Sequence, residues 1–184
     1  MNAQIQAACE KFAALLQDEY ARIERMRQDT EMTDFTALSQ ITVGVMPGDG
    51  IGPLITEQAL RVLGALMQKE IAGGRIRVRM IEGMTIERRA EMRQSLPEDV
   101  LAACKECHVL LKGPFVTPRA GDPWPNLISA NSLLRRELNL YAAVRPVKIP
   151  DKNIDWCFFR ENIEGEYIWG NKGKGRLHRR AFSM

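Results

Sequence analysis

A glycine-rich loop between an apolar run and a helix-like segment constrains the fold more than any other feature of the sequence. The loop reads VMPGDGIGP at 45–53, with glycine at every second position from Gly48 to Gly52. Residues 41–46 predict a buried strand, and residues 53–71 carry apolar side chains at helical spacing. Pro53 stands where the dinucleotide fingerprint G-x-G-x-x-G needs its third glycine. Two interpretations remain: a loop that lines a ligand, or a plain turn.

Strand-like and helix-like segments alternate along the chain, which predicts an α/β domain with a largely parallel sheet. Further strands are expected at 75–83, 108–114, 140–147 and 154–160, and helices at 3–28, 95–107 and 129–139. Ser95 followed by Glu98 predicts a capping box that starts helix 95–107. Residues 1–40 form an N-terminal helical extension, which packs either on the domain or on a partner chain.

Composition places the chain among ordinary globular proteins. Of its 184 residues, 45% are hydrophobic and 27% are charged. The net charge of +3 arises mainly in a basic tail at 171–184, so it does not indicate a nucleic-acid-binding face. A solvated terminus is favoured for that tail. The sequence holds neither an apolar run of the roughly 18 residues that span a bilayer nor a signal peptide, so we expect a cytoplasmic protein.

The stretch CKECH at 104–108 matches the c-type haem pattern C-x-x-C-H. Haem attachment requires export, and the remaining Cys and His residues lack zinc-finger spacing. Reduced and inert thiols at a helix end are therefore favoured, and no metal ligand is assigned.

Three arginines lie at the ends or starts of separate predicted elements. They are Arg135, Arg145 and Arg160, with the neutral donors Ser129 and Asn131 beside the first. Each guanidinium can bind a carboxylate through two hydrogen bonds. If the arginines converge, they form a site for a polycarboxylate, although spacing alone does not establish convergence.

Five motifs in this order resemble the β-decarboxylating dehydrogenases, a family containing isocitrate, isopropylmalate, homoisocitrate and tartrate dehydrogenases. The motifs are PGDGIGP, KGPFVTP, SANSLLR, LYAAVRPV and FFRENIEGEY, within about residues 41–170. The resemblance implies the family's isocitrate/isopropylmalate dehydrogenase-like α/β fold, truncated here, in place of a Rossmann phosphate loop.

The resemblance also implies roles for individual residues. The substrate carboxylates would be held by Ser129, Asn131, Arg135, Arg145 and Arg160. Tyr167 would act as the general acid that protonates the enol carbon after carbon dioxide leaves. Ile51 and Thr117 would border the nicotinamide cofactor.

We therefore expect oxidative decarboxylation of isocitrate, a tricarboxylic acid cycle reaction, with NAD or NADP and with Mg²⁺ or Mn²⁺. The polar Ser129 and Asn131 favour isocitrate, with isopropylmalate or homoisocitrate as alternatives. Overall resemblance favours NAD and a homo-oligomer such as a dimer. Family members place the catalytic lysine and the metal-binding aspartates beyond the residues present here, so the chain is expected to be inactive alone. The alternative is a non-catalytic homologue that binds substrate or pairs with full-length subunits.

Overall fold

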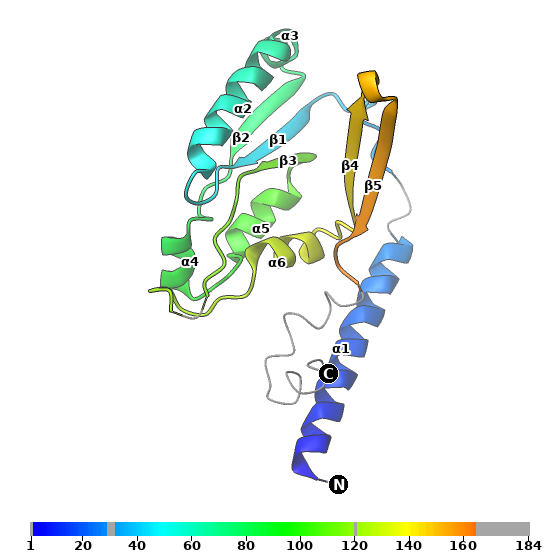
Figure 1. Cartoon of the computed structure of the whole chain (residues 1–184), viewed down its shortest axis with the longest axis vertical. Coiled ribbons are helices and arrows are strands. Elements are labelled where there is room, and N and C mark those ends of the chain that lie inside the picture. Colours follow the sequence, from blue (N-terminus) through cyan, green and yellow to red (C-terminus); the bar gives the residue numbers. More distant parts are fainter. Residues whose placement is uncertain (1, 29–31, 120, 165–184) are drawn as a thin grey trace. The chain divides into compact units, whose positions relative to one another are not determined.

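The computed structural model describes residues 2–28, 32–119 and 121–164, and the chain divides into two units, Met1–Leu38 and Ser39–Met184 (Figure 1). The first unit contains helix α1 (Ala3–Gln28), which confirms the predicted helix at 3–28. Arg25 and Arg27 in its last turn stabilise the helix, because their positive charges lie at the negative end of the helix dipole. Among the described helices, none combines the length and apolar character needed to cross a membrane.

The second unit is built on a parallel three-stranded sheet in the order β2-β1-β3. The strands are β1 (Ile41–Met46), β2 (Ile76–Met80) and β3 (Val109–Lys112), which confirms three of the predicted strands. Val43 pairs with Val78 on one side and with Val109 on the other. Val45 and Met46 at the end of this central strand point to opposite faces of the sheet, and both are fully buried.

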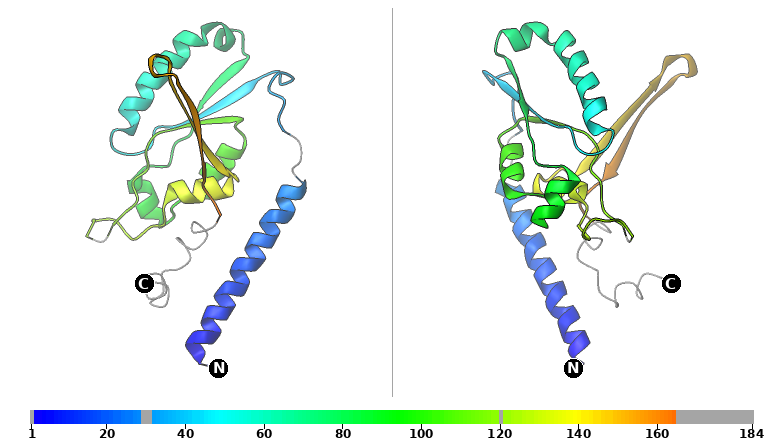
Figure 2. Two further views of the ribbon diagram at one scale, coloured as in Figure 1. Left: turned by 45° about the vertical axis from the view of Figure 1, so that its right-hand side comes forward. Right: turned by 90° about the vertical axis from the view of Figure 1, so that its left-hand side faces the viewer.

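Helices lie on both sides of this sheet (Figures 1 and 2). α2 (Gly52–Leu66) and α3 (Gln68–Ala72) lie along one side, where a one-residue break at Met67 divides the helix expected at 53–71. α4 (Ile86–Met92), α5 (Glu98–Lys105) and α6 (Ala130–Glu137) gather on the other. The main core cluster is apolar and is contributed by β1, by the segments after β2 and β3, and by α5 and α6: Met46, Ile81, Met84, Val100, Cys104, Phe115, Ala130 and Leu134.

The expected α/β fold with a parallel sheet is confirmed, whereas the last two predicted strands form an antiparallel hairpin apart from that sheet. β4 (Ala142–Ile149) pairs with β5 (Ile154–Glu161) through a short turn that contains the 3-10 helix η1 (Pro150–Lys152). Asn153 closes the turn with a left-handed φ of 51°. A parallel pairing needs a crossover of a dozen residues or more, which this connection cannot supply.

Two local expectations also need correction. The capping box at Ser95 does not form, because α5 begins at Glu98 after an extended Pro97 with ψ of 143° and without a side-chain cap. The proline disfavours helical backbone at Leu96, the residue before it. Helix α4 was not expected. Its N-cap is Thr85, whose hydroxyl accepts from the Arg88 amide at 3.5 Å.

The hairpin predicts self-association, because large apolar side chains lie exposed on both of its faces. Val144 and Phe159 pair across the strands with 53% and 73% of their surface exposed. We expect concentration-dependent association in sedimentation velocity, and a shift towards monomer in the double variant Val144→Ser/Phe159→Ser. Replacing Lys148 and Asp155, the ion pair on the same face, with serine is the control that leaves the apolar area intact. A wild-type chain that stays monomeric at every concentration contradicts this prediction.

Candidate active site

Helix α6 presents two of the predicted substrate-binding side chains on one face. Ser129 is its N-cap, with the hydroxyl accepting from the Ser132 amide at 3.4 Å. Ala130 and Leu134 are buried in the core and fix the rotation of the helix. Asn131 and Arg135 are four residues apart and therefore lie one above the other on the same face.

Lys112, the last residue of β3, joins these two side chains to form what we call the α6 cluster: Lys112, Asn131 and Arg135. Its ammonium donates to Asn131 Oδ1 at 2.8 Å and to the Gly113 carbonyl at 2.7 Å. The same nitrogen lies 4.3 Å from the centre of the Phe115 ring. Partial burial, and then the positive charge of Arg135, lower the pKa of Lys112. The cluster is therefore a concentrated positive charge that lacks an acidic partner among the described contacts.

The other two predicted arginines lie together on the hairpin. In the register of β4 and β5, Arg145 pairs with Phe158 and Ala143 pairs with Arg160. Paired residues share a face of an antiparallel ribbon, so Arg145 and Arg160 lie diagonally on the same face. Arg160 donates to Asn162 Oδ1 at 3.1 Å, and Asn162 is buried, which orients this guanidinium.

Convergence of the three arginines stays a hypothesis, since their described contacts place them in two groups. Arg135 lies with Lys112 and Asn131, whereas Arg145 lies with Arg160. Within the described residues, no hydrogen bond or ion pair joins the two groups. Tyr167, the predicted general acid, lies outside the described residues.

The two residues predicted to border the cofactor lie in loops that pack backbone against backbone. Ile51 lies within the glycine loop with 62% of its surface exposed, and Thr117 is exposed in the segment after β3. The Asp49 amide donates to the Pro114 carbonyl at 2.7 Å, and the Gly113 amide donates to the Met46 carbonyl at 2.8 Å. These bonds hold the glycine loop against residues 113–117.

The close approach of the two backbones explains why glycine occupies most of these positions. A Cβ on Gly48 would lie 2.1 Å from the Pro114 carbonyl oxygen, and one on Gly113 would lie 1.8 Å from that of Pro47. Gly50 differs, because its φ is 59° and a Cβ there would meet open space. Of the glycines in this loop, Gly50 is thus the one beside whose backbone there is open space, where a ligand can approach closely.

A buried ion pair fastens these loops to α4. Asp49 Oδ2 accepts from Arg89 Nη2 at 2.7 Å, and both side chains are almost completely buried. Sequence reasoning missed Asp49, Arg89 and Lys112. The first and last stand inside quoted motifs, PGDGIGP and KGPFVTP, whereas Arg89 gives no signal because charged residues are rarely buried in full.

The CKECH stretch has the inert character expected from the sequence. All four cysteines of the chain are free thiols. Cys104 is buried with its sulfur 3.6 Å from Met46 Sδ, and burial raises the pKa of this thiol to about 11. His108 Nδ1 accepts from the Thr42 amide at 3.1 Å. Within the described part of the chain, no group of three or more His, Cys, Asp or Glu residues can hold a metal ion.

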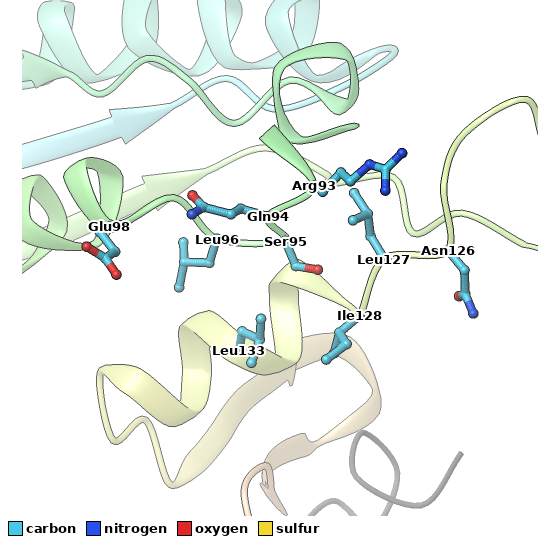
Figure 3. A pocket seen from close by; sticks show the side chains of 9 residues that line it. All are labelled: Arg93, Gln94, Ser95, Leu96, Glu98, Asn126, Leu127, Ile128 and Leu133. Atoms are coloured by element: carbon cyan, nitrogen blue, oxygen red, sulfur yellow. The ribbon is translucent and has the colours of Figure 1, made fainter. Parts of the chain in front are cut away.

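An open pocket of about 390 Å³ lies beside α6 but contains none of the predicted site residues (Figure 3). Its lining includes Ser95, Asn126 and Leu133, the last of these on α6. Leu133 is two residues after Asn131 and so faces a different side of the helix. The pocket is therefore separate from the α6 cluster.

A family model and individual relatives both relate this chain to isocitrate and isopropylmalate dehydrogenases. A family model described as isocitrate/isopropylmalate dehydrogenase matches residues 42–183, which extends into the segment set apart as a tail at 171–184. The chain is 40% identical over 135 residues to an isocitrate dehydrogenase (NADP) of Caldococcus noboribetus, covering 69% of this chain and 30% of that protein. It is 35% identical over 134 residues to a 3-isopropylmalate dehydrogenase of Aquifex aeolicus, covering 68% and 34%.

A third relative is a mitochondrial isocitrate dehydrogenase (NAD) regulatory subunit 3 of Arabidopsis thaliana, 34% identical over 135 residues that cover 68% of this chain and 32% of that protein. The chain thus spans about a third of the length of the curated relatives that it matches.

The glycine packing leads to a stability prediction. Gly113→Ala should lower the free energy of unfolding by about 2–4 kcal/mol, because its Cβ collides with backbone that cannot move independently. Gly50→Ala should cost only about 1–2 kcal/mol, the strain of a left-handed alanine in open space. Urea unfolding followed by circular dichroism compares the two. Equal losses would show that the contact between the loops is not close in solution.

Proposed function

The chain belongs to the isocitrate/isopropylmalate dehydrogenase family, and we propose that it supplies the carboxylate-binding part of a site for isocitrate. The reaction proposed is NAD(P)-linked oxidative decarboxylation to 2-oxoglutarate. The α6 cluster is the observation that carries this proposal. It joins two cationic groups and an amide on one side of a core-anchored helix.

The chemistry of the α6 cluster suits one carboxylate. Arg135 can bind both oxygens through its planar guanidinium, and Lys112 adds a point charge. Asn131 accepts from Lys112 through Oδ1, so the donor it can offer is its amide nitrogen. A bound carboxylate would also relieve the repulsion between Lys112 and Arg135.

The hairpin arginines are proposed to bind a second carboxylate of the same substrate. Arg145 and Arg160 lie on one face, and the Asn162 contact keeps the Arg160 guanidinium in a defined direction. Two cationic groups at separate places fit a molecule with several carboxylates better than a monocarboxylate. Isocitrate has three, whereas isopropylmalate has two and an apolar branch. Tyr167 stays a predicted proton donor.

Ile51 and Thr117 are proposed to border the nicotinamide ring, which accepts a hydride when the cofactor is bound. Their exposure, and the open space at Gly50 beside Ile51, fit this role. The described residues do not fit a divalent metal, since they contain no group of three acidic, His or Cys side chains. We therefore assign no metal-dependent step to them. NAD is proposed over NADP on family resemblance, as are a homo-oligomer and a cytoplasmic location.

A second candidate is a non-catalytic role in which the chain binds substrate or pairs with full-length subunits. The likeness to a protein named as a regulatory subunit favours this candidate. It uses the same carboxylate contacts, so binding tests the shared part of both proposals. The two proposals differ when this chain is combined with full-length subunits whose own site arginines have been replaced. Turnover of isocitrate by that assembly would favour the proposal that this chain is catalytic.

Arg135→Ala should weaken isocitrate binding, measured by calorimetry on the full chain, by about 10- to 100-fold, the effect of losing a charge-assisted hydrogen-bonded pair. Arg136→Ala is the matched control. It removes the same charge from the next position of α6, off the face shared by Asn131 and Arg135. Equal losses in both variants would indicate non-specific attraction and would remove the α6 cluster from the site.

The lowered pKa of Lys112 predicts a pH dependence of binding. The ammonium loses its proton at a lower pH than an ordinary lysine, so isocitrate affinity should fall as pH rises through that lowered value. Lys112→Arg stays charged over the same range and should remove the fall. The substrate carboxylates are ionised throughout and do not contribute. Calorimetric titration from neutral to alkaline pH tests this, and an identical fall in the arginine variant would contradict it.

A further inference from the structure

The Asp49–Arg89 ion pair holds more than its two partners. Asp49 Oδ1 accepts from the Ile86 amide at 2.6 Å, at the first residue of α4. Asp49 Oδ2 accepts from the Val116 amide at 2.7 Å as well as from Arg89. Arg89 returns to the same residue and donates from Nη2 to the Val116 carbonyl at 3.0 Å. Both backbone groups of Val116 are thus bound by the pair.

One member of the pair and the residue that the pair binds are close in sequence to the two residues proposed to border the cofactor. Asp49 stands two residues before Ile51, and Val116 stands immediately before Thr117. One ion pair therefore sets the distance and the relative orientation of both loops. Neither Asp49 nor Arg89 is itself exposed to a ligand, because their side chains are 2% and 0% exposed.

The cost of this arrangement indicates a purpose beyond packing. Arg89 is fully buried, and its Nη1 lacks a hydrogen-bond partner among the described residues. An unsatisfied buried group of this kind opposes folding, and a buried ion pair often adds no more stability than apolar side chains of similar size. What apolar side chains cannot do is bind the amide and the carbonyl of one residue at fixed positions.

We propose that Asp49 and Arg89 are positioning residues that hold the Ile51 and Thr117 loops at the spacing the nicotinamide cofactor requires. This inference rests on the proposed function, because it assumes that these loops border the cofactor. The pair acts on cofactor affinity through Val116 and the glycine loop, without touching the cofactor. No hydrogen bond or ion pair among the described residues joins this pair to the α6 cluster or to the hairpin arginines. The Phe115 ring lies between them, 5.9 Å from Arg89 Cζ and 4.3 Å from Lys112 Nζ, so substrate affinity should change much less than cofactor affinity.

The test compares NADH binding, followed by NADH fluorescence, with isocitrate binding, followed by calorimetry, on the full chain. Arg89→Lys keeps the charge but cannot bind Asp49, Met84 and Val116 together, and it is the mild variant. Asp49→Asn is the severe one. Asp99→Asn is the matched control, because it breaks the exposed ion pair of Arg88, the next residue of α4. Amide hydrogen exchange at Val116 and within β1 separates local loosening from global unfolding.

We expect Arg89→Lys to weaken NADH binding by about tenfold, in line with a small misplacement of binding groups. Isocitrate affinity should stay within about twofold, because a weak contact through the Phe115 ring is all that couples Arg89 to the α6 cluster. Exchange at the Val116 amide should accelerate more than exchange in β1, and Asp99→Asn should change none of these. If Asp49→Asn unfolds, Arg89→Lys decides alone.

Three results would overturn the inference. In the first, NADH affinity of Arg89→Lys stays constant although exchange at the Val116 amide accelerates. In the second, its NADH and isocitrate affinities fall together with global stability, as they would if the pair had a structural role alone. A wild-type chain that binds isocitrate but not NADH overturns the inference and also refutes the proposed cofactor site. That failure is recognised before any variant is made.

Discussion

The ion pair between Asp49 and Arg89 connects three parts of the chain that are far apart in sequence: the loop after β1, the start of α4 and the segment after β3. Both loops of the candidate cofactor site depend on this connection. The segment after β3 leads to Ser129 and α6, and the loop after β1 leads into α2. In a low-dielectric interior such a pair has a narrow geometric tolerance, since each oxygen of the carboxylate is already committed to a donor.

The apolar core determines which polar groups reach the surface of α6. Ala130 and Leu134 enter the same cluster as Met46 and Phe115, so the helix can rotate very little. Asn131 and Arg135 are then directed to the side where β3 ends in Lys112. The burial of two apolar residues on the adjacent side of one short helix thus brings two cations and an amide together.

Local patterns predicted the strands and the motif positions well, because each depends on residues close in sequence. Strand β1 was predicted at its observed bounds, and α6 lies within the helix predicted at 129–139. What could not be predicted depends on contacts made through space. The hairpin separates from the sheet because its connection is short, and Pro97 moves the start of α5 away from Ser95. Arg89 is buried only because Asp49, forty residues earlier, is buried with it.

The central position of β1 has a consequence for how the second unit folds. Both of its neighbours are parallel strands that come later in the chain, so β1 waits unpaired until β2 and then β3 are available. Such non-local pairing is intrinsically slow, because the chain loses loop-closure entropy before the stabilising contacts form. The β4–β5 hairpin needs only its own turn and can form in microseconds. Its arginines are therefore expected to reach their final register before the loops of the candidate cofactor site exist, and during that interval β1 has two open edges that another chain can pair with.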